Sequence, residues 1–211
     1  MSANGKALAV LAVLAVTGGV AAAIPGDARA ASSGCGSSCV SLASQAFGTS
    51  DVSAVSGGTA AGQPVVMAVA ADITTEDFLV SDDGTVANFC SAGLMTGVNC
   101  TTWPSDPVFE YEYAPGGAAS GLCLGTATAA VSGTAVTLQP CGVDARTVWV
   151  ELAIDKINGV DPLIAGTNTI SSTPLVLTAG ATGAQLTTRK LSLSAGTFAQ
   201  HQMWRLLTGI L

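Results

Sequence analysis

The sequence predicts an all-β protein, and three observations support this prediction. Short strand-like runs recur after residue 31, for example "QPVVMAVA", "TVWVELAI" and "QLTTRKLSLS". Turn pairs such as Asp83-Gly84, Ser132-Gly133 and Asn158-Gly159 separate them. No segment after residue 31 keeps a helical period of apolar residues between helix caps. Many short strands at intervals of about ten residues are typical of a barrel or a sandwich.

Residues 1–30 predict a signal peptide. Lys6 supplies a basic start, "ALAVLAVLAVTGGVAAAIPG" supplies the apolar run, and Ala28-Arg29-Ala30 forms an A-x-A box. We therefore expect cleavage after Ala30 and a secreted protein. A membrane anchor through the same apolar run is the alternative, but its glycines and the A-x-A box favour cleavage.

Charge is sparse and acidic. Charged residues are 10% of the chain, and 14 Asp and Glu against 7 Lys and Arg give a net charge of −7. An acidic surface repels phosphates, so we expect no nucleic-acid partner and no membrane contact after cleavage. The chain after the signal peptide suits a monomer with an N-terminal segment, 31–46, that holds Cys35 and Cys39, and a single β domain, 47–211.

Six cysteines in an oxidising compartment predict three disulfides. Proximity in the sequence suggests the pairs Cys35 with Cys39, Cys90 with Cys100, and Cys123 with Cys141. A single histidine and the absence of paired C-x2-C knuckles argue against zinc. We expect no metal and no cofactor.

The strands repeat as a unit. In "SGLCLGTATAAVSGTAVTLQPCGVDARTVWV" a Cys-Leu strand, a glycine turn and a "VTLQPC" strand lead to a strand that carries Trp149. Three further units end in Phe78, Phe109 and Trp204, and we interpret all four aromatics as structural core residues. Repetition of a unit that cannot bury its own face indicates a pseudo-symmetric barrel. The clearest single hairpin turn is "SDDGTV", residues 81–86.

These motifs resemble the ricin B-chain type β-trefoil repeat, and Gln202-Met203-Trp204 matches its Q-x-W element. The chain is also similar to small secreted proteins of actinobacteria that have no assigned activity. The resemblance implies a β-trefoil-like barrel with three or four imperfect repeats; a β-sandwich is the alternative that tolerates four. For a three-repeat trefoil, either the unit from Cys90 to Phe109 is a truncated insertion or the N-terminal unit packs outside the barrel.

The resemblance also implies a carbohydrate site in each repeat. Lectins of this type hold a sugar with an Asp two places after the Cys, an aromatic residue and an Asn-Gln pair before the closing Trp. In the unit that ends at Trp149 these positions are Gly125, Gln139 and Arg146-Thr147; in the last unit they are Ala165, Thr178 and His201-Gln202. Most contacts are therefore missing. We expect a core role for Trp204 and a structural role for Gln202, with a degenerate sugar site at Gln202 and His201 as the alternative.

The inventory of reactive side chains argues against an enzyme, and we assign no catalytic residue. His201 is the only histidine, and neither G-x-S-x-G nor H-E-x-x-H occurs. Glu110 and Glu112 alternate along one strand and would suit a glycosidase pair. We expect them instead to form a charged outer face between buried aromatic residues.

Three weaker patterns have structural explanations. Glu76-Asp77 and Asp82-Asp83 match no known calcium loop, so we expect solvated turn residues. Asn99-Cys100-Thr101 is a formal glycosylation sequon, but Cys100 is needed for a disulfide. Trp103 is expected to cover the disulfide beside it.

The sequence therefore predicts a secreted, non-catalytic binding or interaction module with a glycan or a cell-envelope component as its partner. The alternative is a secreted inhibitor or a cell-surface structural protein that acts through loops, with 101–107 and 114–120 as the candidate loops.

Overall fold

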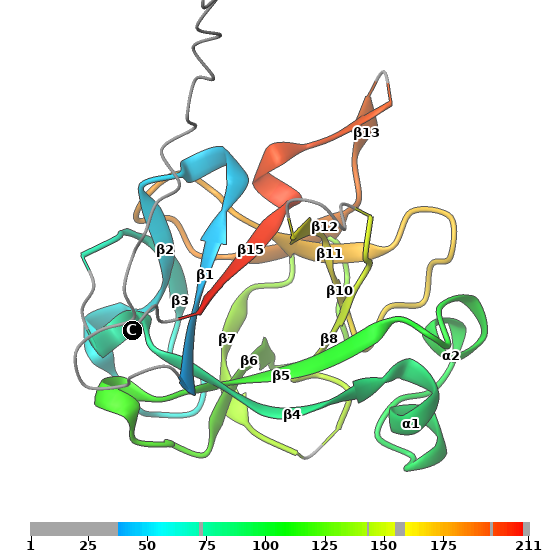
Figure 1. Ribbon diagram of the computed structural model, residues 1–211, viewed down its shortest axis with the longest axis horizontal. Helices are drawn as coiled ribbons and strands as arrows, with labels where there is room; N and C mark the ends of the chain where they lie inside the picture. The colour runs from blue at the N-terminus through cyan, green and yellow to red at the C-terminus, as the bar shows by residue number, and fades with distance from the viewer. Residues whose placement is uncertain (1–37, 72–73, 143, 155–158, 195, 209–211) are drawn as a thin grey trace, which may run out of the picture.

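The computed structural model describes residues 38–71, 74–142, 144–154, 159–194 and 196–208 (Figure 1). The predicted signal peptide and Cys35 lie outside these residues. Within the described part of the chain, no helix is long and apolar enough to cross a membrane.

The main strands form three consecutive repeats of four strands each. Repeat one contains β1 (Cys39–Ser44), β2 (Ser50–Ala54), β3 (Val65–Val69) and β4 (Phe78–Thr85). Repeat two contains β5 (Pro107–Tyr113), β6 (Leu122–Thr126), β7 (Val136–Pro140) and β8 (Val148–Glu151). Repeat three contains β9 (Val160–Asp161), β10 (Leu163–Ala165), β11 (Leu175–Thr178), β12 (Thr187–Lys190) and β15 (Trp204–Thr208). In repeat three, β9 and β10 together take the place of one strand.

The first and last strands of each repeat form the barrel. Antiparallel pairing joins β1 to β4, β4 to β5, β5 to β8 and β8 to β10. It also joins β9 to β15 and β15 to β1. Only Pro162 separates β9 from β10, so the series of strand pairs that starts at β1 also ends at β1. Proline has no backbone N–H to donate, which explains the interruption in this ladder. β1 lies within the stretch 31–46 that we separated from the domain, yet residues Val40–Ser44 pair with β15.

The three middle hairpins, β2–β3, β6–β7 and β11–β12, meet one another around a pseudo-threefold axis. At each tip a glycine with positive φ donates its backbone N–H to the next hairpin, at 2.7 Å in all three cases. The three bonds are Gly62 to Leu138 O, Gly133 to Thr188 O, and Gly183 to Met67 O. A side chain would strain this backbone, which is why glycine occupies each tip. This threefold arrangement is a β-trefoil, as the repeats predict.

The aromatic residues that close the repeats fill the barrel. Phe78 and Trp204 are the first residues of β4 and β15, and Trp149 is the second residue of β8. The exposed fractions of Phe78, Trp149 and Trp204 are 0%, 0% and 2%. The Trp149 Nε1 donates to Leu124 O at 2.8 Å, and the Trp204 Nε1 donates to Leu177 O at 3.0 Å. Phe109 differs from them, because it lies in the first strand of repeat two and stacks on Tyr111. It closes no fourth repeat.

Residues 86–106 form an insertion between β4 and β5. They contain the short helices α1 (Val86–Ser91) and α2 (Val98–Thr102), joined by the Cys90–Cys100 disulfide. The unit from Cys90 to Phe109 is thus an insertion, and the N-terminal unit belongs to the barrel. Phe89 and Met95 of the insertion pack with Val108, Val148, Val150, Ile164 and Val176 on the outer face of the barrel, and Trp103 packs beside them.

Two sequence-based expectations are wrong in this region. No helix was expected, because α1 and α2 are too short to show a helical period. The expected turn at 81–86 is absent, since β4 continues to Thr85 and pairs with β5 as far as Pro107, with one irregularity between Val80 and Asp82. The insertion makes the reversal of the chain instead. Asp82 and Asp83 are exposed on β4, so this polar stretch is a strand on the protein surface.

The other cysteines also join neighbouring segments. Cys123 on β6 is bonded to Cys141 just after β7, as the spacing predicts. Cys39 is disulfide-bonded too, but its expected partner Cys35 lies outside the described residues.

Asn99 fastens the insertion to repeat three. It is fully buried, and its side-chain nitrogen donates to Ala165 O at 3.1 Å and to Gly166 O at 3.0 Å. Its side-chain oxygen accepts a hydrogen bond from Asn168 at 3.0 Å. The sequon at Asn99 therefore presents no accessible amide for a glycan.

We predict that Asn99→Ala lowers the free energy of unfolding by about 2–3 kcal/mol, because it leaves buried polar groups without partners. Urea denaturation followed by circular dichroism measures the change. Thr101→Ala is the matched control, since it removes the same sequon but only a surface hydrogen bond. Equal stability of the Asn99 variant and the wild type would show that this contact does not fasten the insertion.

Candidate ligand-binding site

Gln202, the first residue of the closing motif in repeat three, is buried inside the protein. Its side-chain oxygen accepts the backbone N–H of Ser192 at 2.7 Å. Its side-chain nitrogen donates to Lys190 O at 2.9 Å and to the Thr178 hydroxyl at 3.2 Å. These bonds occupy both ends of the amide, so Gln202 holds the segment after β12 against the barrel. It is not placed to contact a ligand directly.

The same position in repeat one is Glu76, which is also buried. Both of its carboxylate oxygens lie 3.3 Å from the backbone nitrogen of Ala71, which donates to them. Met67 and Thr188 are equivalent residues, because the carbonyl of each accepts the N–H of a glycine at a hairpin tip. Ala71 and Ser192 each follow four residues later, so they are equivalent too. In repeats one and three, therefore, a buried side chain accepts a hydrogen bond from the backbone N–H that follows the third strand.

In repeat two, the acceptor for the equivalent backbone N–H comes from another strand. Thr147 occupies the closing-motif position but is too short to reach the equivalent donor, Gly142 N–H. Glu110 on β5 accepts that N–H at 3.1 Å and also accepts a hydrogen bond from the Thr147 hydroxyl. Glu110 is only 3% exposed, so the expectation that it belongs to a charged outer face is wrong. Its neighbour Glu112 accepts the Gly121 N–H at 2.6 Å.

The strand register corrects the positions assigned to repeat three. Cys123 on β6 pairs with Gln139 on β7, and Val176 on β11 pairs with Arg189 on β12. The stretch "PLVLT" is therefore the second strand of its repeat and not the third. Its apolar pattern resembles "AVTLQ", which explains the error. The Asp position in repeat three is Thr178 and the aromatic position is Arg189, instead of Ala165 and Thr178.

With the register corrected, neither an Asp nor an aromatic residue occupies the sugar-contact positions in any repeat. The Asp positions hold Ser53, Gly125 and Thr178, and the aromatic positions hold Ala68, Gln139 and Arg189. In repeat two a Cβ at position 125 would lie 2.7 Å from Arg146 O, so no side chain fits there. Repeat two cannot regain the missing Asp without a backbone shift.

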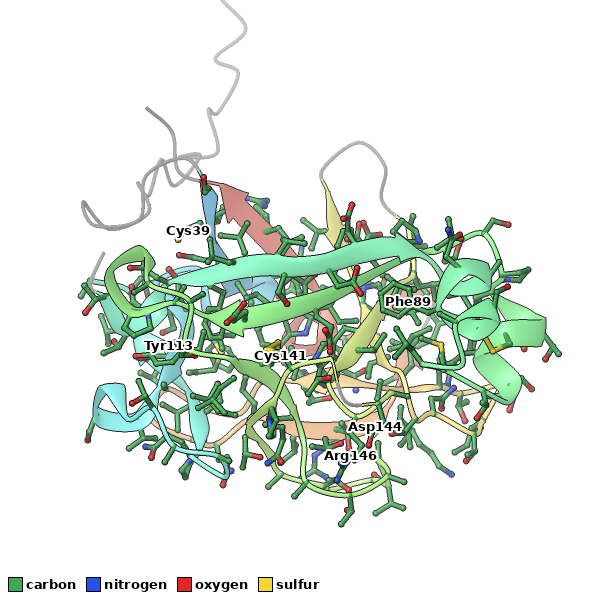
Figure 2. The ribbon with its side chains drawn as sticks, turned by 90° about the horizontal axis from the view of Figure 1, so that it is seen from below. Cys39, Phe89, Tyr113, Cys141, Asp144 and Arg146 are labelled. Carbon is green, nitrogen blue, oxygen red and sulfur yellow. A yellow bond between two sulfur atoms is a disulfide. The ribbon has the colours of Figure 1, made fainter. Side chains whose placement is uncertain are left out.

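Arg146 occupies the place that an asparagine would have in repeat two, and its guanidinium is already paired. Its Nε lies 2.8 Å from both carboxylate oxygens of Asp144, and its Nη1 donates to Ala127 O at 2.9 Å. Figure 2 shows Asp144 and Arg146 close together at the surface. The hydrogen bonds from Arg146 hold the pKa of Asp144 below its usual range. This ion pair is partly exposed and stabilises the turn before β8 only weakly.

Repeat three keeps the best set of polar side chains. Arg189 is exposed on β12, and His201 is half-buried directly before Gln202. The His201 carbonyl accepts the N–H of Ala179, which fixes this segment beside β11. The sequence thus pointed to Gln202 and His201. It missed Arg189, which only the strand register places at the aromatic position.

The acidic residues near β4 form no metal site. Glu76 and Asp77 are buried, which contradicts the expectation of solvated turn residues, whereas Asp82 and Asp83 are exposed. Among the residues that the structure describes, no three His, Cys, Asp or Glu side chains gather in a way that could hold a metal ion.

Comparison with solved structures identifies the fold class. The designed threefold-symmetric protein ThreeFoil matches 80% of this chain and 97% of its own, with 16% identity and a TM-score of 0.55. The Clostridium thermocellum exo-β-1,3-galactanase 1,3Gal43A matches 81% of this chain with 11% identity and a TM-score of 0.56. The Polyporus squamosus lectin, bound to a Neu5Ac-containing trisaccharide, matches 82% with 15% identity and a TM-score of 0.51.

This chain spans 30% of the galactanase chain and 49% of the Polyporus lectin chain. No protein-family model matches the sequence, and no curated protein matches it. The similarity at these identities concerns the fold, which is the β-trefoil found in lectins.

We predict that Glu110→Ala lowers the free energy of unfolding by about 2–4 kcal/mol, because the Gly142 N–H and the Thr147 hydroxyl lose their acceptor. Glu110→Gln keeps an acceptor oxygen and should lose much less. Thermal and urea denaturation of both variants measure the difference, with Glu112→Ala as the control on the same strand face. A Glu110→Ala variant as stable as the wild type would contradict the structural role.

Proposed function

We propose that the protein is a secreted, non-catalytic carbohydrate-binding module of the ricin B type, and that repeat three holds its degenerate site. The observation that supports this best is the presence in that repeat of Arg189 at the aromatic position and of His201 at the asparagine position. Secretion is supported by the signal-peptide pattern of residues 1–30 and by disulfides, which persist in oxidising compartments. The β-trefoil lectins among the solved structures support the ligand class.

The chemistry of repeat three favours an acidic glycan. Where such lectins have an aromatic ring, Arg189 presents a planar guanidinium that stacks on a sugar face or binds a carboxylate with two hydrogen bonds. In a chain with a net charge of −7, an exposed cation at this position attracts an anionic group selectively. The Polyporus lectin was solved with a sialylated trisaccharide, which is a ligand of this class.

The non-catalytic part of the proposal is supported by the hydrogen bonds of the two carboxylates on β5. Glu110 and Glu112, the pair that would suit a glycosidase, are both engaged by backbone N–H groups. A catalytic pair needs a carboxylate free to transfer a proton or attack the sugar.

A glycan array with the oxidised protein tests the proposal. We expect sialylated or uronic-acid glycans to bind, and we expect Arg189→Ala to weaken this binding by roughly tenfold, as the loss of a charged hydrogen bond implies. Lys190→Ala is the matched control, because it removes the same charge from the next residue, whose side chain lies on the opposite face of β12. Gln202→Ala should lower the melting temperature.

Equal binding by the Arg189 and Lys190 variants would contradict the proposed site. If no glycan binds, the proposed function is wrong, and protein partners of loops 101–107 and 114–120 become the next targets.

A further inference from the structure

The segment that leads into the closing aromatic is longer in repeat three than in the other two repeats. From the backbone donor to the aromatic it measures seven residues in repeats one and two and twelve in repeat three, counted from Ala71 to Phe78, Gly142 to Trp149 and Ser192 to Trp204. The longer segment forms a small hairpin of β13 (Leu193–Ser194) and β14 (Thr197–Phe198), in which Leu193 pairs with Phe198. In Figure 1, β13 projects away from the barrel strands. Repeats one and two reach their aromatics without these additional residues, so the trefoil does not require this hairpin.

The apolar side chains of this hairpin are not part of the core. Leu193 is 59% exposed. Phe198 is half-buried, but within the described part of the chain it does not pack on either of the two apolar core clusters. A side chain that stays in contact with water contributes little to stability. The hairpin therefore presents apolar surface that a ligand can cover.

The hairpin lines an open groove of about 620 Å³. Leu193 and Phe198 line the groove from the hairpin, and residues 172–173 line it from the loop before β11. The remaining lining consists of residues 190–192, at the end of β12 and directly after it. Sites for small molecules in proteins typically have volumes of about 300–1,000 Å³. The groove therefore has room for a small molecule.

Hydrogen bonds hold the lining segments in place. The Ser192 N–H donates to the buried side chain of Gln202 at 2.7 Å, and the Ser192 carbonyl accepts the N–H of Ala199 at 3.1 Å. The Leu191 N–H donates to Pro174 O at 2.7 Å, which fixes the end of β12 beside the loop before β11. The groove is therefore formed before a ligand binds, and this lowers the entropy cost of binding.

The charge of the groove is positive. Of the described residues that line it, Lys190 is the one that carries a charge, and its ammonium has no ion-pair partner in the described part of the chain. The sequence after Asp161 contains no Asp or Glu, although the net charge of the chain is −7. The other polar side chains of the lining are the hydroxyls of Ser172, Thr173 and Ser192. This lining favours a ligand that carries a negative charge on an apolar body.

We propose that this groove binds a small carboxylic acid with a chain of apolar carbon atoms, such as a medium-chain fatty acid. The Lys190 ammonium pairs with the carboxylate, and the hydroxyls of residues 172–173 donate hydrogen bonds to it. Leu191, Leu193 and Phe198 cover the carbon chain, which removes their exposed surface from water. This site is separate from the glycan site proposed above, because the side chains of Arg189 and Lys190 lie on opposite faces of β12.

Titration with octanoate at pH 7, followed by calorimetry and by the NMR shifts of the backbone amides, tests the proposal. We expect saturable binding, with large shifts at Leu193 and Phe198. Octylamine has the opposite charge and should not bind, and 1-octanol should bind roughly tenfold more weakly than octanoate because it lacks the charge. Failure of octanoate to bind, or equal binding of octylamine or 1-octanol, would overturn the proposal.

Two neighbouring cations provide a matched pair of variants. Lys190→Ala should weaken octanoate binding by roughly tenfold, whereas Arg189→Ala removes the same charge from the opposite face of β12 and should not change it. For glycan binding we expect the reverse effects of these two variants, so a failure of this proposal and a failure of the glycan site are distinguishable. Equal weakening of octanoate binding by both variants would contradict the proposal.

A second pair of variants tests the hairpin itself. Leu193→Ser should weaken octanoate binding by roughly threefold to tenfold, because it removes apolar contact area. Val69→Ser is the matched control, since Val69 is 63% exposed at the end of β3 in repeat one. Both side chains are at the surface, so both variants should melt close to the wild-type temperature. Unchanged octanoate affinity of the Leu193 variant would show that the hairpin is not part of the site.

Vesicles distinguish a free acid from the lipids of a membrane. We expect no binding to vesicles of phosphatidylglycerol and phosphatidylcholine, in which the acyl chains are covered by the headgroups. Binding to these vesicles without binding of free octanoate would mean that the hairpin contacts a membrane surface, and this result would overturn the proposal.

Discussion

The β-trefoil of this protein depends on one repeated hydrogen bond, in which a buried side chain accepts the backbone N–H that follows the third strand of each repeat. Ala71, Gly142 and Ser192 are the donors. The donor residues lie at the surface and the acceptor side chains are buried, so each hydrogen bond ties a surface segment to the core. The acceptors differ in type, being Glu76, Glu110 and Gln202, but each fixes the segment that leads into a closing aromatic. The hairpin tips and the core tryptophans are positioned by this arrangement.

These hydrogen bonds distinguish the residues that the fold requires from those that remain able to contact a ligand. The Q-x-W motif resembles a sugar-binding signature, but Gln202 has a structural role here. Both ends of its side-chain amide are hydrogen-bonded to other groups inside the protein. Under the proposed function, recognition depends on side chains that the fold does not use, such as Arg189 on the surface of repeat three. Pseudo-symmetry makes this separation visible, because the other repeats show what the fold alone requires.

The sequence predicted the parts of this molecule that follow from local periodicity. Strand alternation and the glycine turns predicted an all-β barrel or sandwich. The resemblance of the repeats that end at Trp149 and Trp204 to the ricin B-chain repeat then implied a β-trefoil, with a β-sandwich as the alternative. An insertion was one of two alternatives that the sequence left open, but its two helices were not predicted, since they are shorter than the window in which a helical period shows. The register of repeat three was wrong because two neighbouring strands have similar apolar patterns, and only strand pairing separates them. The role of Glu110 was missed because its partner, Gly142, lies on a distant segment.

Amide hydrogen exchange measured by NMR tests the central claim most directly, on the wild type and on Gln202→Ala. In the wild type, the amides of Ala71, Gly142 and Ser192 should exchange slowly, because each donates to a buried side chain. In the variant we expect the Ser192 amide alone of these three to lose its protection, while Ala71 and Gly142 keep theirs relative to the remaining stability. Unchanged protection of Ser192, or an equal loss at all three amides, would contradict the account that each repeat is held by its own buried acceptor.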